Sequence, residues 1–245
     1  MTNPEAHHSP AHSEIPVTMG DVLFQSPQVI ADPDGFIESG ACSQEVLESF
    51  TSAFTTPPGN LSGPGTAAAE ALFVLDVDQD EGAVIAVKLG VMSSEAAGNH
   101  FPDLADKLTK PKVLFIGGHM EPVVLAVGLV DTDVALDVPH RFGDEGQFLI
   151  MQTGESAPSV DEQVQAVTPD GAAPVLRGMR LFHSYVTFDA QAVNGWLDSG
   201  LVQSQPAKSQ DVFSARPGET WRGIMRRRPF PENLFSTWAL YPERN

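Results

Sequence analysis

The chain has 245 residues, of which 42% are apolar, and its net charge at pH 7 is −18. This composition predicts a globular protein with a proper core, and because no apolar run approaches the ~20 residues that cross a bilayer, it excludes a membrane-spanning protein. The single cysteine, Cys42, excludes an internal disulfide, and the polar start has no signal peptide, so we expect a cytoplasmic location.

The first 17 residues are polar and predict a disordered tail. The histidines of this tail lack the fixed geometry of a metal site; they are His7, His8 and His12. A strand is expected within GDVLFQSPQVI, residues 20–30, before a turn at 31–35. Apolar residues then recur at helical spacing over 43–54, where Ser43 can cap the N-terminus of an amphipathic helix.

The segment 76–82, DVDQDEG, has the spacing of the first three ligands of a calcium-binding loop. Such a loop needs Gly at its sixth position and Glu at its twelfth, where this chain has Glu81 and Val87. The flanking runs, 71–75 and 83–87, are short, apolar and rich in β-branched residues, which is typical of strands. We therefore predict the turn of a β-hairpin here and no metal site.

Strands outnumber helices in the rest of the chain. Apolar runs predict strands at 111–116, 123–130, 147–152 and 177–187, and an Asp N-cap predicts a helix at 189–197. The interval 153–174 between them is acidic and rich in turn residues. Because strands and helices do not alternate regularly, the pattern favours an α+β fold over a doubly wound sheet.

The strand at 111–116 ends in Gly117, Gly118 and His119, which form the main candidate ligand-binding segment. A histidine after two glycines at the end of an apolar strand can present both its backbone and its side chain to a ligand. The alternative is a turn histidine that bonds only to nearby backbone. Tyr185, in the strand predicted at 177–187, is a further candidate for ligand binding.

Motifs of the common enzyme classes are absent from the sequence. It has no zinc-protease motif, no nucleophile elbow, no phosphate-binding Walker loop and no dinucleotide fingerprint. No nucleophile, base and orienting group can be assembled from its scattered histidines. The sequence therefore favours a non-enzymatic protein without cofactor, although an enzyme remains an alternative.

Acidic charge is concentrated in the first two-thirds of the chain. Up to Asp170 there are 5 basic and 26 acidic residues, whereas from Gly171 onward there are 9 and 6. Because phosphate contacts supply most of the affinity for nucleic acids, direct binding to DNA or RNA is not expected. The candidate basic patch consists of Arg222, Arg226, Arg227 and Arg228. We interpret it as a helix end that pairs with the protein's own acidic surface, with a phosphate or partner site as the alternative.

Several motifs in order resemble one known family. They are Ser26-Pro27 with Asp32-Pro33 and Phe36, Leu114 to Gly118, Arg180-Leu-Phe182 before Tyr185, Asp211-Val-Phe213, the run from Trp221 to Pro231, and the closing Arg244-Asn245. From about Met19 onward the chain resembles the YqgE/AlgH family of small bacterial proteins, in a divergent, longer actinobacterial form. The resemblance implies a single α+β domain over 18–245, with a largely antiparallel, partly barrel-like sheet, flanking helices and an insertion at about 37–69.

The most polar family motifs are altered in this chain. Relatives carry Glu-His-Asn where this chain has 76–81, and Asn-Arg/Lys-Pro where it has 89–91. The family's Gly-Gly-Pro is 117–119 here, and its Gly-Tyr-Ala/Ser-Gly-Trp is 184–188. If these motifs form a ligand site in relatives, that site differs in this protein.

Two functions from different classes follow from these observations. The family is often labelled a transcriptional regulator, without a recognised DNA-binding motif or an established activity. We therefore expect a non-enzymatic protein that binds an unknown protein partner or a small ligand in a regulatory role. The alternative is a nucleotide- or metabolite-binding enzyme with its site near Gly117 to His119.

Overall fold

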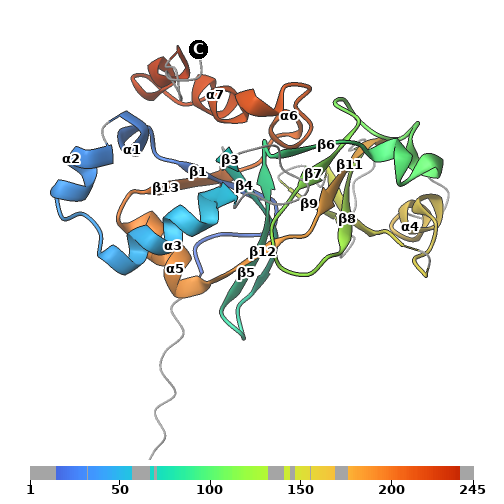
Figure 1. Cartoon of the computed structure of the whole chain (residues 1–245), viewed down its shortest axis with the longest axis horizontal. Helices are drawn as coiled ribbons and strands as arrows, with labels where there is room; N and C mark the ends of the chain where they lie inside the picture. The colour runs from blue at the N-terminus through green and yellow to red at the C-terminus, as the bar shows by residue number, and fades with distance from the viewer. Residues whose placement is uncertain are drawn as a thin grey trace, which may run out of the picture.

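A computed structural model describes residues 15–31, 33–56, 67–68, 71–131, 141–143, 147–154, 156–168 and 176–237. Two large β-sheets lie at the centre, with helices α3 and α5 at one end of the molecule and α4 at the other (Figure 1). Helices α6 and α7 lie along one side of the sheets (Figure 1). The three tail histidines and the closing Arg244-Asn245 lie outside the described residues.

The first large sheet has five strands in the order β12-β5-β4-β1-β13, and every pair is antiparallel. Its strands are β1 (Asp21–Gln25), β4 (Ala71–Asp78), β5 (Ala83–Leu89), β12 (Val186–Asp189) and β13 (Val202–Pro206). The β4–β5 hairpin confirms the turn predicted at 76–82. Gly82 supplies a positive φ of 68°, and the Asp78 carboxylate accepts hydrogen bonds from the backbone N–H groups of Asp80 and Glu81.

The second large sheet has six strands in the order β6-β7-β11-β8-β10-β9. Its strands are β6 (Met92–Ala96), β7 (Val113–Ile116), β8 (Val124–Val130), β9 (Arg141–Phe142), β10 (Phe148–Gln152) and β11 (Leu176–His183). Only β7 and β11 pair in parallel. A short third sheet joins β2 (Thr55–Thr56) to β3 (Ala67–Ala68), inside the region expected as an insertion.

A central apolar core fills the space between the two large sheets. Phe24, Phe73 and Val87 come from the five-stranded sheet, and Phe115 and Phe182 come from the six-stranded sheet. All five side chains are fully buried, so this core removes a large apolar area from water and supplies most of the driving force that holds the sheets together.

The C-terminal helices close one side of this core. They are α6 (Ser209–Val212), η3 (Pro217–Glu219), α7 (Thr220–Arg226) and η4 (Glu232–Thr237). Trp221, Ile224 and Met225 bury one face of α7 in the core, and the Trp221 indole N–H donates to the Gln25 carbonyl at 2.8 Å. The Trp-Arg run of the family-like motif therefore has a structural role here.

The outer face of the five-stranded sheet is covered by α3 (Gln44–Phe54) and α5 (Ala190–Asp198). Both helices were expected from apolar spacing and caps, and the Asp189 carboxylate accepts from the Gln191 N–H at 2.8 Å as the predicted N-cap of α5. Trp196 of α5 packs against Phe54 of α3, and its indole N–H donates to Ser49 at 2.8 Å.

The outer face of the six-stranded sheet has shorter cover. It consists of α4 (Val160–Ala166) and two 3-10 turns, η1 (Ala97–Asn99) and η2 (Pro102–Leu104). Val160 and Val164 of α4 pack on Leu149 and Met151 of the sheet. Helix α4 was not expected, because the acidic composition of 153–174 favoured turns.

Two sequence predictions of strands need correction. The strand expected over 20–30 ends at Gln25, and helices α1 (Pro27–Ala31) and α2 (Pro33–Glu38) follow it. The single strand expected over 177–187 is divided at Ser184, whose φ of 61° turns the backbone out of the extended region. As a result β11 belongs to the six-stranded sheet and β12 to the five-stranded sheet.

The α+β class and the mostly antiparallel pairing are confirmed. The partly barrel-like closure is not found among the described residues, where each large sheet runs from one edge strand to another, although the Lys88 N–H donates across to the Gly117 carbonyl at 2.8 Å. Of the expected tail, residues 1–14 lie outside the described chain, whereas Ile15 and Val17 are buried in the core. None of the helices in the described residues has the length and apolar composition that a membrane crossing requires.

Candidate functional site

Gly117 and Gly118 lie where the end of β7 crosses the chain between β11 and β12. The Gly117 N–H donates to the His183 carbonyl at 2.9 Å. A Cβ atom on Gly117 would overlap the Ser184 carbonyl, and one on Gly118 would overlap the Tyr185 backbone. These glycines are therefore required by the close approach of two backbone segments, and both are buried.

The structure brings His119 and Tyr185 together through their backbones. The N–H groups of His119 and Met120 both donate to the Tyr185 carbonyl, at 3.1 and 3.2 Å. The side chain of His119 is exposed, and Tyr185 is half-buried. This geometry agrees with the simpler interpretation of His119 as a turn residue that bonds to nearby backbone.

Tyr185 lines a hollow at the end of the six-stranded sheet, which we call the Tyr185 hollow. Its volume is about 430 Å³, and the start of β8 and the end of β10 form the rest of its wall, together with Glu121, Thr153 and Ala157. The hollow is open to solvent at a point where the two sheets meet. One of the four residues proposed for ligand binding thus faces a real concavity.

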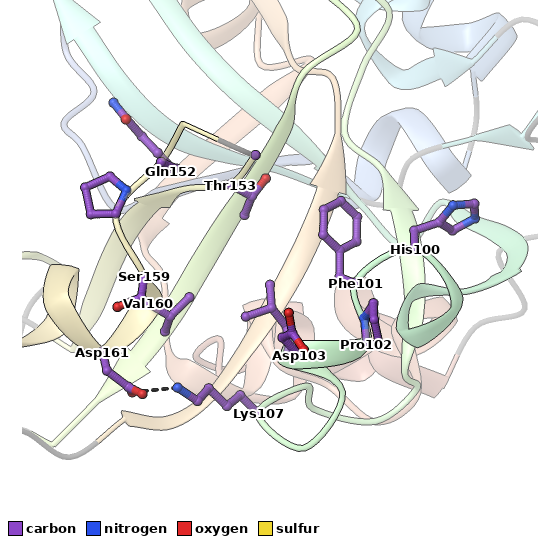
Figure 2. A pocket seen from close by; sticks show the side chains of 14 residues that line it. His100, Phe101, Pro102, Asp103, Lys107, Gln152, Thr153, Ser159, Val160 and Asp161 are labelled. Atoms are coloured by element: carbon purple, nitrogen blue, oxygen red, sulfur yellow. Dashed lines mark hydrogen bonds and ion pairs between the residues drawn. The ribbon is translucent and has the colours of Figure 1, made fainter.

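A larger opening, the α4 cleft, lies on the outer face of the same sheet. Its volume is about 510 Å³. One wall carries His100, Phe101, Asp103 and Lys107, and the opposite wall carries Gln152, Thr153, Ser159, Val160 and Asp161 (Figure 2). The α4 cleft and the Tyr185 hollow share Gln152, Thr153, Gly154 and Ala157, so the two spaces meet at the chain segment between β10 and α4.

Hydrogen bonds hold that shared segment in place. The Thr153 hydroxyl donates to the Val124 carbonyl at 2.5 Å, at the start of β8. The side-chain amide of Gln163, on α4, bonds both the N–H and the carbonyl of Gln152, at 2.8 and 2.9 Å. The floor of the site is therefore preformed by β8, β10 and α4 before any ligand arrives.

A capping box explains why α4 begins at the edge of the cleft. The Ser159 hydroxyl accepts from the Glu162 N–H at 3.2 Å, and the Glu162 carboxylate accepts from the Ser159 N–H at 2.8 Å. These hydrogen bonds lower the pKa of Glu162. The pattern Ser-x-x-Glu was the signal in the sequence that could have located this helix.

One ion pair spans the α4 cleft. Lys107 Nζ lies 2.5 Å from the Asp161 carboxylate, joining the turn after η2 to the first turn of α4 (Figure 2). The His100 ring forms a hydrogen bond of 2.6 Å with the Glu95 carboxylate. In Figure 2, Phe101 lies between His100 and Thr153. Lys107, Asp161 and His100 are therefore already paired within the protein.

Two of the four arginines in the candidate basic patch are paired with the protein's own acidic groups. Arg227 bonds at 2.6 Å to Asp211, a carboxylate that is only 1% exposed, and Arg228 bonds at 2.7 Å to Glu232. Burial raises the pKa of Asp211 despite the opposing effect of Arg227. Arg222 is half-buried and Arg226 is exposed on α7. The four arginines thus do not form a single uncompensated surface.

Two buried cations were not anticipated. Arg180 stacks 4.2 Å above the Phe115 ring and donates to the carbonyls of Val212 and Ser214, so it ties β11 to the C-terminal helices. Burial lowers its pKa to about 10 and lowers the pKa of Lys88, on β5, to about 8. Neither residue lines the α4 cleft or the Tyr185 hollow, and no pattern in the sequence marked Lys88 as buried.

Among the residues that the structure describes, no group of three or more His, Cys, Asp or Glu side chains lies close enough together to hold a metal ion. Within the DVDQDEG segment, Asp78 accepts hydrogen bonds from the turn backbone, and Asp76 accepts one from the Val77 N–H in β4.

Comparison with known proteins finds several bacterial proteins that are similar to this chain in sequence, and one crystal structure that is similar in fold. The chain is 28% identical over 173 residues to UPF0301 protein CE2927 of Corynebacterium efficiens, which covers 70% of this chain and 81% of the relative. It is 29% identical over 177 residues to UPF0301 protein ML0028 of Mycobacterium leprae, covering 69% and 79%. The crystal structure of protein DIP2367 from Corynebacterium diphtheriae has the same fold, with a TM-score of 0.59 and 22% identity over 93% of this chain and 94% of that one. No protein-family model matches the chain.

Proposed function

This chain belongs to the UPF0301 (YqgE/AlgH) family, an uncharacterised family, and we propose that it is a non-enzymatic protein that binds a small ligand in a regulatory role. The ligand site proposed is the α4 cleft together with the Tyr185 hollow. This location lies beside the segment Gly117 to His119, which the sequence had indicated, but its walls come from other residues.

The observation that carries the proposal is the meeting of the two concavities at Gln152 to Ala157. Their volumes, about 510 and 430 Å³, fall in the range of roughly 300–1,000 Å³ that is usual for ligand sites. Apolar and aromatic side chains such as Phe101, Val160 and Tyr185 line them together with polar side chains, which make up half of the residues around the α4 cleft, so a ligand would meet both apolar surface and groups that can orient it.

The hydrogen bonds of the site support binding rather than catalysis. The hydroxyl of Thr153 is committed to a backbone carbonyl, and the hydroxyl of Ser159 caps a helix. His100 is paired with Glu95 rather than with either hydroxyl. Nucleophilic catalysis needs a hydroxyl within hydrogen-bond reach of a base, and the described residues of the cleft do not provide that pair.

A regulatory role fits a site whose walls are separate segments of the chain. The η2 side and the α4 side are joined across the opening by the exposed Lys107–Asp161 pair, which contributes little stability by itself. A ligand bound between the two walls would add contacts to both, and would thereby favour one arrangement of them.

The experiment is a melting-temperature screen of the purified chain against a metabolite library. We expect at least one compound to raise the melting temperature, because a ligand that binds only the folded state stabilises it by mass action. The Ala157→Trp variant should lose this response, since Ala157 lines both concavities. Ala166→Trp, at an exposed position on α4 outside the cleft, is the matched control and should keep it.

Two results would contradict the proposal. One is a screen in which no compound at millimolar concentration shifts the melting temperature of the parent chain. The other is turnover of a phosphoester, peptide or ester substrate that is lost in His119→Ala, which would favour the alternative of an enzyme near Gly117 to His119.

A further inference from the structure

We infer that the ligand of the α4 cleft is an organic cation, an amine carried on a short apolar chain. The inference rests on the proposed function and adds the chemical class of the ligand. Three features lead to it: the charged groups that the site leaves without partners, the state of the helix N-terminus at its edge, and its aromatic walls.

The charges left over in the site are negative. Lys107 is neutralised by Asp161 at 2.5 Å, and His100 is engaged by Glu95. Asp103 on the wall of the cleft and Glu121 on the wall of the Tyr185 hollow have no ion pair with any residue that the structure describes. Each concavity therefore offers one uncompensated carboxylate and no uncompensated cation from a described side chain.

The N-terminus of α4 already carries negative charge, and its capping box uses the N–H groups of Ser159 and Glu162. A helix N-terminus attracts anions through its free N–H groups, but the Ser159 hydroxyl takes the Glu162 N–H and the Glu162 carboxylate takes the Ser159 N–H. The first turn also carries two carboxylates of its own, Asp161 and Glu162. A phosphate or carboxylate ligand would therefore meet like charge at the place where a helix usually favours it.

The field of the whole protein acts in the same direction. The net charge is −18, and the residues that line the site come from the acidic part of the chain before Asp170 or from Tyr185. Clefts with low-dielectric walls focus such a field and raise the local concentration of ligands of opposite charge. A cationic ligand is thus attracted, and polyanions such as nucleotides are repelled.

Aromatic rings complete the recognition. Figure 2 shows Phe101 and Asp103 on the wall that faces Thr153 and Ser159. Tyr185 and Glu121 both line the Tyr185 hollow. An ammonium group is attracted by the face of an aromatic ring by about 0.5–1 kcal/mol at exposed sites and by more when it is desolvated. Val160, on the opposite wall of the α4 cleft, and Val124, in the Tyr185 hollow, can cover the methylene groups of an aliphatic amine.

Three probes of equal length and different charge test the inference by calorimetry on the full chain. They are 1,6-diaminohexane, 1,6-hexanediol and adipate. We expect the diamine alone to bind, and we expect its Kd to rise by at least about tenfold in the double variant Asp103→Asn/Glu121→Gln. The double variant Glu45→Gln/Glu48→Gln removes the same charge from exposed positions of α3 and controls for attraction to the acidic surface. It should bind as the parent does.

The possible outcomes distinguish an error in the proposed class of ligand from an error in the proposed binding site. If the diol or adipate binds as tightly as the diamine and Ala157→Trp prevents it, the cation inference is overturned and the proposed function stands. Equal binding of the diamine by both double variants overturns the inference as well, because the affinity is then a property of the net charge. Diamine binding that survives Ala157→Trp would place the ligand elsewhere and contradict both.

Discussion

The two large sheets differ in what covers their outer faces. On the five-stranded sheet, α3 with 11 residues and α5 with 9 lay continuous apolar stripes on the strands, and Phe54 and Trp196 interlock between them. On the six-stranded sheet, α4 has only 7 residues and is accompanied by 3-10 turns. The α4 cleft opens where this shorter cover ends.

The difference leaves the closed face to supply stability and the open face available for the proposed ligand. Long amphipathic helices repeat apolar residues every three or four positions and can close a sheet face completely. Short elements cover less of the sheet, so polar groups such as Thr153, Lys107 and Asp161 remain at the surface between them. Measurements of stability should therefore respond strongly to changes on the closed face and weakly on the open one.

The largest effect is expected from Trp196→Ala on the closed face. Trp196 is fully buried and packs edge-on against Phe54 and Phe188, so its loss should lower the free energy of unfolding by about 3–5 kcal/mol. Urea unfolding gives this value directly. Phe101→Ala is the corresponding change on the open face. If it lowered the free energy of unfolding as much as Trp196→Ala does, the proposed difference between the two faces would be wrong.

A pH-dependent effect is expected from Lys88. Burial lowers its pKa from 10.5 to about 8 in the folded state, so between these pH values the unfolded chain binds more protons than the folded one. Stability should therefore rise as pH increases from 8 to 10.5, by up to roughly 3 kcal/mol at about 1.4 kcal/mol per pKa unit. Denaturant unfolding across this range should show the increase in the parent chain and lack it in Lys88→Met.

A smaller effect is expected from Ser159→Ala at the edge of the cleft. Loss of the N-cap of α4 should cost about 0.5–2 kcal/mol, and Ser159→Asp, which keeps an acceptor at the cap, should restore most of it. Hydrogen exchange would locate the change in α4. Equal loss of protection in α5 would show that the two faces do not unfold independently.

The smallest effect is expected from Lys107→Ala. Because the Lys107–Asp161 pair is exposed, its removal should change the free energy of unfolding by less than about 1 kcal/mol, and less at high salt. Thermal unfolding in low and high salt measures this. A loss of several kcal/mol would mean that the pair holds the two walls of the cleft together.

The elements with strong local signals could be predicted from the sequence. Apolar spacing and an N-cap located α3 and α5, and the alternation around 76–82 located the β4–β5 hairpin. The division of the expected 177–187 strand could not be predicted, because a serine with a positive φ has no marker in the residues around it. Helix α4 had a marker in its capping box, but the surrounding acidic composition outweighed it.

The candidate site was harder to predict than the fold. Gly117 and Gly118 were proposed from the sequence as part of a ligand site, whereas in the structure they are needed because the Ser184–Tyr185 backbone passes too close to them for a Cβ atom. The walls of the α4 cleft lie near residues 100–107 and 152–161, about 50 positions apart, and meet only in the folded protein. No local pattern contains that pairing.

The turn at Ser184 has one further consequence. The chain leaves β11 of the six-stranded sheet, passes Tyr185 in the hollow, and enters β12 of the five-stranded sheet without a loop between them. Four positions after Tyr185 lies Asp189, the cap of α5. The proposed binding site is thus joined to helix α5 by only the four residues of β12, so any shift of the Tyr185 backbone acts directly on the strand that leads into that helix.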